Sequence, residues 1–151
     1  MPPNDVVSAA QMHLLIVHEV EPLWLCEMLH SFGFLVQACR HGRDALDCLA
    51  QMKGFTGVLL DVHARSSDEK PLLPELRHRY PQMPIITMGG RKDIDRLRAS
   101  IQLGAHEYLV TPIDGQVLKA KCAKVFFHQE RVDGSQGLDL QNDQTTPEAT
   151  S

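Results

Sequence analysis

A continuous apolar run that finishes on a carboxylate lies in the segment Gly57-Val58-Leu59-Leu60-Asp61-Val62-His63. A short apolar run without polar alternation is typical of a strand that is buried on both faces of a sheet. A carboxylate that closes such a strand is costly unless it is hydrated, paired or bound to a metal. The run therefore predicts a central strand with Asp61 at its carboxyl end, either as a solvated residue or as a nucleophile or metal ligand.

Similar apolar runs lie on both sides of this strand, and helical patterns separate them. The runs cover residues 14–17, 34–36, 84–88 and 107–110, and the helical patterns cover 25–32, 45–50, 72–80, 94–101 and 117–128. Strands that alternate with helices of this length predict right-handed crossovers and a parallel sheet with helices on both faces. We therefore expect an α/β protein, a (βα)5 doubly wound parallel five-stranded sheet.

In such sheets the functional site lies outside the carboxyl ends of the strands, near the point where the strand order reverses. The residues expected at that edge are His18, Glu19, Asp61, Gly89, Thr111 and Pro112. Glu19 and Asp61 form an oxygen-rich pair that suits a hard divalent ion such as Mg²⁺. An alternative is a transition-metal site that adds the imidazoles of His18 and His63, since these ligand types suit Zn²⁺ or Ni²⁺.

Length and composition predict one folded domain between two tails. The chain has 151 residues, and we expect a domain over 12–130 with disordered tails at 1–11 and 131–151. The 15 Lys and Arg residues against 19 Asp and Glu include no basic block that could neutralise a row of phosphates, so we expect no nucleic-acid partner. No apolar run approaches the roughly 18 residues of a membrane span and no signal peptide is visible, so we expect a cytoplasmic protein without membrane contact.

The sequence resembles the response-regulator receiver domain of bacterial two-component signalling, the family that includes the single-domain chemotaxis regulator. The resemblance covers about residues 13–128 and is carried by LLIVHEVEPL, CRHGRDALDCL, GVLLDVH, ELRHRYPQMPIITMGG and QLGAHEYLVTPID, in that order. It implies a flavodoxin-like receiver fold. It also implies transfer of a phosphoryl group from the phosphohistidine of a histidine kinase or a phosphotransfer protein to an aspartate.

Carried over position by position, the resemblance assigns roles to individual residues. Asp61 matches the phosphoacceptor, and Glu19, Asp61 and the backbone carbonyl of His63 match the ligands of Mg²⁺. Tyr108 matches the aromatic residue of the fifth strand that turns inward on activation. The Thr111-Pro112 bond matches a cis bond in the family, so we expect it to be cis.

Three of five signature positions depart from the family pattern. His18 replaces the first acid, Gly89 the switching Thr or Ser, and Thr111 the phosphate-binding Lys. Loss of the Lys removes a charge-assisted hydrogen bond of roughly 1.5–3 kcal/mol. His18 either replaces the Lys in part or is a hydrogen-bonded residue at a strand end. We therefore expect a degenerate active site that binds Mg²⁺ weakly. We also expect weak phosphorylation, and only on Asp61.

Two functions follow from this pattern. The first is a single-domain response regulator in a phosphorelay, with Asp61 as phosphoacceptor, a histidine kinase or phosphotransfer protein as donor and a further protein as downstream partner. The alternative is a pseudo-receiver that works without phosphate, as a docking or homodimerisation module whose surface surrounds Tyr108, Ile101 and Val117. An independent enzyme is not expected, because the sequence shows neither a nucleophile–base pair nor a Gly-rich phosphate loop.

Overall fold

The structure is a computed structural model of the chain, and it describes residues 12–20 and 23–127. The expected tails at 1–11 and 131–151, and the end of the last predicted helix at His128, lie outside the described residues. Within them, no helix is long and apolar enough to cross a membrane.

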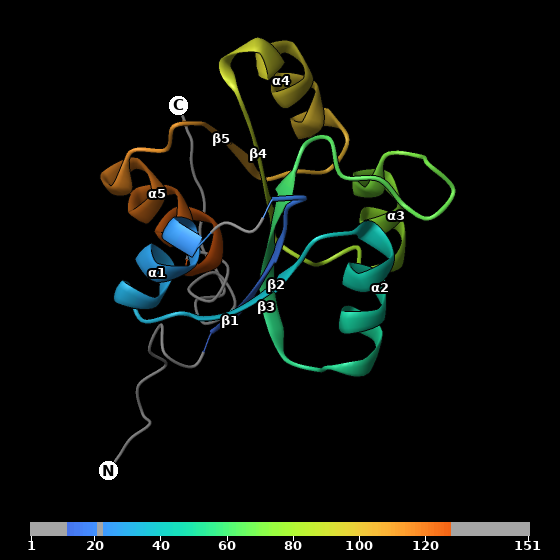
Figure 1. Cartoon of the computed structure of the whole chain (residues 1–151), viewed down its shortest axis with the longest axis horizontal. Coiled ribbons are helices and arrows are strands. Elements are labelled where there is room, and N and C mark those ends of the chain that lie inside the picture. The colour runs from blue at the N-terminus through green and yellow to red at the C-terminus, as the bar shows by residue number, and fades with distance from the viewer. Residues whose placement is uncertain (1–11, 21–22, 128–151) are drawn as a thin grey trace, which may run out of the picture.

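Five parallel strands form one sheet in the order β2-β1-β3-β4-β5 (Figure 1). The strands are β1 (His13–Val17), β2 (Leu35–Cys39), β3 (Phe55–Asp61), β4 (Ile85–Gly89) and β5 (Glu107–Val110). The chain adds β2 on one side of β1 and β3 on the other, so the strand order reverses between β1 and β3. Asp61, the last residue of β3, therefore lies at the switch point where ligands bind in folds of this kind.

Helices cover both faces of the sheet, as the alternating pattern predicts. They are α1 (Leu23–Ser31), α2 (Gly42–Gln51), α3 (Leu72–Arg79), α4 (Ile94–Gln102) and α5 (Gly115–Cys122). Figure 1 shows α1 and α5 on one side of the strands and α2 and α3 on the other. A short 3₁₀ helix, η3 (Arg91–Asp93), precedes α4, and a π-helical segment, η4 (Ala123–Phe127), continues α5.

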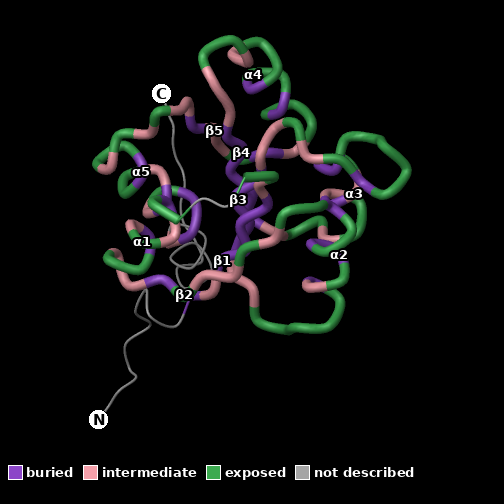
Figure 2. Tube along the Cα trace, in the orientation of Figure 1, coloured by how far each residue is buried: buried purple, intermediate pink, exposed green. Residues whose placement is uncertain are grey.

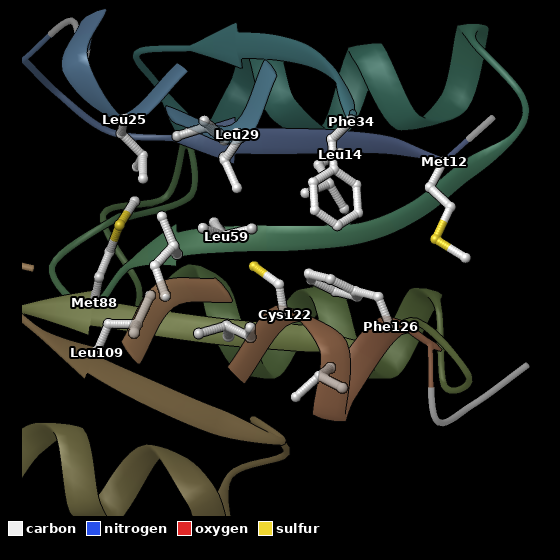
Figure 3. Close-up of a cluster of buried hydrophobic side chains, with 14 residues drawn as sticks. Met12, Leu14, Leu25, Leu29, Phe34, Leu59, Met88, Leu109, Cys122 and Phe126 are labelled. Carbon is white, nitrogen blue, oxygen red and sulfur yellow. The ribbon is translucent and has the colours of Figure 1, made fainter. Parts of the chain in front are cut away.

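The strands β1, β3 and β4 are buried on both faces because their successive side chains enter two separate apolar clusters. Leu14 and Ile16 belong to the cluster under α1 and α5 that Figure 3 shows, together with Phe126. Leu15 and Val17 belong to the cluster under α2 and α3. Figure 2 shows the buried residues running along the strands, with exposed residues on the outer helix faces. This two-sided burial explains why the strands read as continuous apolar runs.

Three helices begin earlier than their apolar pattern predicts: α1, which begins at Leu23 and not at Leu25, α2 and α5. The Asp114 carboxylate accepts hydrogen bonds from the backbone N–H groups of Gln116 (2.7 Å) and Val117 (3.2 Å), so α5 begins at Gly115 and not at Val117. The helix α2 begins at Gly42, three residues before Ala45, the first residue of its apolar pattern. Gly42 is buried, and a Cβ atom there would collide with the backbone carbonyl of Arg65. The loop after β3 therefore packs directly on the first turn of α2.

Candidate functional site

A polar cleft of about 700 Å³ opens at the carboxyl ends of the strands. Its walls come from the loop after β1, the turn between β2 and α2, and the end of β3 with the loop that follows it. Three residues that the sequence analysis singled out line this cleft together: Glu19, Asp61 and His63. The structure thus brings the expected acidic pair and the expected carbonyl ligand to one place.

The two oxygens of Asp61 have different surroundings. Oδ1 accepts a hydrogen bond from the backbone N–H of His63 (2.9 Å). Oδ2 lies 3.8 Å from Nε2 of His18, which is beyond hydrogen-bond distance. The Asp61 side chain keeps 18% of its surface exposed. One carboxylate oxygen is therefore held by the backbone, and the other is open to a ligand or a reacting atom.

His18 is anchored by its other ring nitrogen. Nδ1 accepts a hydrogen bond from the backbone N–H of Val20 (3.1 Å). In the neutral imidazole, a ring nitrogen that accepts a hydrogen bond carries no proton, so the proton would lie on Nε2, the nitrogen that faces Asp61. The contact with Val20 fits the role of a hydrogen-bonded residue at the strand end.

The donor atoms of the cleft fit a hard divalent cation. Glu19 and Asp61 supply carboxylate oxygens and His63 supplies a backbone carbonyl, the ligand types that Mg²⁺ prefers. The imidazole of His63 points to a different partner, Asp93, at 2.9 Å. In the part of the chain that the structure describes, no three His, Cys, Asp or Glu side chains gather as a metal cluster. The oxygen site therefore fits the described geometry better than the transition-metal alternative does.

Asp93 fills the space beside Gly89, where the family pattern places a switching hydroxyl. A Cβ atom at Gly89 would lie 3.0 Å from Cγ1 of Val62 and 3.2 Å from Oδ2 of Asp93. The same Oδ2 accepts a hydrogen bond from the backbone N–H of Gly90 (3.0 Å), while Oδ1 pairs with Nε2 of His63. The hydrogen bond from Gly90, with that from His63, holds the pKa of the Asp93 carboxyl below its ordinary value.

Asp93 was missed by the sequence analysis. The signal that could have revealed it is its position three residues after Gly90. Gly90 caps the short helix η3, and Asp93 is the third residue of that helix, where a carboxylate can accept from the backbone of the capping residue. The pairing with His63 joins two loops that are far apart in sequence, so no local pattern could have revealed it.

Thr111 is bound to β4 and is absent from the walls of the cleft. Its backbone N–H donates to the carbonyl of Gly89 (2.8 Å), and its hydroxyl donates to the same oxygen (3.3 Å). The Thr111-Pro112 peptide bond is cis, which confirms the expectation. Thr111, Pro112 and Gly89 thus lie together at the ends of β4 and β5, and the Thr111 hydroxyl points to the backbone instead of to Asp61.

The expected switch residue, Tyr108, is half-buried and held by its neighbours. Lys121 donates a hydrogen bond from Nζ to the carbonyl of Tyr108 (2.5 Å) and lies 5.0 Å from the centre of its ring. Lys121 and Lys124 also pair with Glu107 at 3.3 and 3.0 Å. Burial alone would raise the pKa of Glu107, but the hydrogen bonds from Tyr108 and the two lysines outweigh it and lower that pKa. These contacts fix β5 against α5.

The other residues of the expected interaction surface are accessible. Ile101 on α4 is 39% exposed and Val117 on α5 is 45% exposed. Their exposure is compatible with the predicted docking face.

A family model described as the response regulator receiver domain matches residues 23–123 of this chain. An NtrX-like response regulator of Rickettsia felis is 27% identical over 132 residues, which cover 82% of this chain and 28% of that protein. The transcriptional regulatory protein ZraR of Escherichia coli is 27% identical over 106 residues, which cover 70% of this chain and 24% of that protein. The chain thus spans only about a quarter of the length of these curated relatives.

Solved structures show the same fold over nearly their whole length. The signal receiver domain of an HD domain-containing protein from Pseudomonas fluorescens superposes with a TM-score of 0.71 at 22% identity, covering 85% of this chain and 96% of that one. A CheY-like receiver domain protein from Methanospirillum hungatei superposes with a TM-score of 0.68 at 20% identity, covering 80% of this chain and 97% of that one. The flavodoxin-like receiver fold expected from the sequence is therefore confirmed.

Proposed function

Because this chain belongs to the response regulator receiver domain family of two-component signalling, we propose that it accepts a phosphoryl group on Asp61. The observation that carries the proposal is the position of the Asp61 carboxylate. It ends the central strand at the switch point, lines the polar cleft, and keeps Oδ2 without a hydrogen bond from any described residue. A carboxylate with one oxygen held and one oxygen open is suited to nucleophilic attack.

The transfer forms one bond and breaks one bond. An oxygen of the Asp61 carboxylate attacks the phosphorus of a phosphohistidine, and an Asp61 O–P bond forms as the P–N bond breaks. The electron pair of the P–N bond returns to the imidazole of the donor. Glu19, Asp61 and the carbonyl of His63 would hold Mg²⁺, which when bound neutralises charge on the phosphoryl oxygens.

We propose that this transfer is slow. Position 111 holds Thr, whose hydroxyl is bound to Gly89, so the pocket lacks the Lys that pairs with the phosphoryl group in the family pattern. A missing charge-assisted hydrogen bond of roughly 1.5–3 kcal/mol slows the step about tenfold to a hundredfold if it acts in the transition state.

The proposed donor is a histidine kinase or a phosphotransfer protein, and the proposed output is binding of a further protein. The charge pattern of this chain predicts no nucleic-acid partner. One relative is named a transcriptional regulatory protein, so this point stays a prediction.

A second candidate function is a pseudo-receiver that works without phosphate. The specific observation in its favour is Asp93, which occupies the space at Gly89 and pairs with His63, so the loops after β3 and β4 are joined before any phosphate arrives. The surface around Tyr108, Ile101 and Val117 would then be a fixed docking face for a partner or a second copy of the chain. Amide exchange with and without beryllofluoride separates the two functions, because only the switching receiver changes protection at Tyr108 and α4.

The experiment that tests the proposal is incubation of the full chain with acetyl phosphate and Mg²⁺, followed by intact mass measurement. We expect a mass increase of one phosphoryl group on a minor fraction of the chain, and no increase in Asp61→Asn. A mass increase that persists in Asp61→Asn would show that another residue is the acceptor.

A further inference from the structure

Two of the three arginines in the walls of the cleft, Arg40 and Arg65, are anchored to backbone carbonyls and form no ion pair with a described carboxylate. Arg40 donates from Nε to the backbone carbonyl of Glu19 (3.2 Å), and Arg65 donates from one Nη to the backbone carbonyl of Glu69 (2.9 Å). Among residues 12–20 and 23–127, neither guanidinium forms an ion pair. Each is thus anchored to the backbone by one N–H group and keeps its other N–H groups for a ligand.

The fold holds both arginines at the cleft. Arg40 follows β2 directly and is tied to the loop after β1. Arg65 lies in the loop after β3, and its backbone forms a bridge with that of Pro71. The Arg65 carbonyl also packs against Gly42 so closely that a side chain at position 42 would collide with it. Since three different loops carry Glu19, Arg40 and Arg65, their meeting at one cleft is a property of the fold and has no local sequence signal.

The charges in the cleft would favour an anion beside Asp61 once a divalent cation is bound there. Three arginines, Arg40, Arg43 and Arg65, face four carboxylates there: those of Glu19, Asp44, Asp61 and Glu69. A divalent cation on Glu19 and Asp61 would leave the cleft net positive. A guanidinium presents a planar fork of donors that matches phosphate oxygens in pairs, which a Thr hydroxyl cannot do.

We propose that Arg40 and Arg65 bind the phosphate group of the phosphoryl donor in this cleft. The inference rests on the proposed function of Asp61 and adds its donor subsite. The ligand class is a dianionic phosphate with an activated bond, either an acyl phosphate or a phosphoramidate such as phosphohistidine. Arg40 and Arg65 act on the phosphate, and Asp61 receives it.

The test is a titration of inorganic phosphate into the full chain in the presence of Mg²⁺, followed by calorimetry. Saturable binding is expected, weakened about tenfold in Arg40→Gln and in Arg65→Gln and less in Arg40→Lys, because a charge-assisted hydrogen bond is lost in each Gln variant. Arg98→Gln is the matched control, since Arg98 is an exposed arginine on α4 outside the cleft. Arg40, Arg65 and Arg98 are all exposed, so the circular dichroism of the variants should match that of the parent chain.

Absence of saturable binding, or equal weakening in Arg98→Gln, would overturn the proposal. Phosphorylation kinetics add a second readout with two donors, acetyl phosphate for the acyl phosphate class and phosphoramidate for the phosphohistidine class. A raised KM in Arg40→Gln and Arg65→Gln with one donor supports the site and identifies that donor class. An unchanged KM with both donors contradicts it.

The two proposals fail in different ways. Phosphate binding that depends on Arg40 and Arg65, in a chain that gains no phosphoryl mass, would retain the binding site and reject Asp61 as acceptor. Normal phosphorylation of Asp61 in both arginine variants would retain the function and reject the binding site.

Discussion

Nε2 of His63 lies 2.9 Å from Oδ1 of Asp93, so the loop after β3 is tied to the helix η3 that leads into α4. The backbone N–H of the same His63 donates to Asp61. One residue therefore contacts both the candidate acceptor and the neighbouring loop. In a receiver whose position 89 holds Gly, this pairing gives the two loops a connection that does not require a switching hydroxyl.

Asp93→Ala should loosen η3. The carboxylate accepts hydrogen bonds from both Gly90 and His63, and the alanine variant leaves both donors without this acceptor. Faster amide exchange is expected at residues 90–94, measured by hydrogen exchange with mass spectrometry. Asp95→Ala, which changes an exposed carboxylate on the next turn, is the control and should leave this region unchanged. Equal protection in Asp93→Ala and the parent chain would show that the pairing does not stabilise η3.

Gly89→Thr should destabilise the chain and not restore a switch. A Cβ atom at position 89 is already crowded by Val62 and Asp93, and overpacking of this kind costs about 1–3 kcal/mol. The free energy of unfolding, measured with urea, should fall by that amount and should recover in part in the double variant with Asp93→Ala. A Gly89→Thr variant as stable as the parent chain would mean that the space beside Gly89 adjusts freely.

Thr111→Lys should raise the rate of phosphorylation. A Lys at this position supplies the charge-assisted hydrogen bond that the pocket lacks, and such a bond contributes roughly 1.5–3 kcal/mol, or at least about tenfold in rate. The time course of intact mass with acetyl phosphate and Mg²⁺ measures this rate. Thr111→Met, which adds length without charge, is the control. Equal rates in the Lys and Met variants would show that the missing Lys does not limit the reaction.

Glu107→Gln should lower stability in a pH-dependent way. Although burial opposes it, the hydrogen bonds from Tyr108, Lys124 and Lys121 lower the pKa of Glu107, so the folded chain binds its proton less readily than the unfolded chain. The stability it contributes is present above the unfolded pKa of about 4.3 and is lost as pH falls through the lower folded pKa. Solvent screening limits the loss in Glu107→Gln at pH 7 to about 0.5–1 kcal/mol. Urea unfolding at pH 7 and pH 3 checks this, and a loss that is the same at both would contradict it.

The sequence predicts the buried strands and the position of Asp61, because both follow from the pattern of apolar residues. The strands β1, β3 and β4 are buried on both faces, so their apolar runs are continuous, and Asp61 stands out because it closes such a run. The start of α5 was placed two residues late because its cap, Asp114, lies outside the apolar pattern. Arg77 on α3 donates to the carbonyls of Pro81 (2.8 Å) and Gly104 (2.6 Å), and the pattern of its helix shows neither contact. Such contacts depend on which loops meet in space.

The same reason separates the predicted from the unpredicted parts of the site. Glu19, Asp61 and His63 follow strand ends, and parallel strands bring their carboxyl ends to one edge, so their meeting follows from topology. Arg65 lines the cleft from within a loop, and Asp93 contacts His63 from the short helix η3. Loop conformation rests on turns, close approaches and hydrogen bonds between distant residues, which a single sequence does not display.

Chemical mapping of the phosphorylated position is the most direct measurement of the central claim. An aspartyl phosphate is an acyl phosphate, so borohydride reduces it to homoserine, whereas an unmodified aspartate does not react. After incubation with acetyl phosphate and Mg²⁺, reduction and proteolysis, we predict homoserine at position 61 and at no other aspartate. Homoserine at another position, or none anywhere while a receiver with the full set of signature residues is labelled under the same conditions, would contradict Asp61 as the phosphoacceptor.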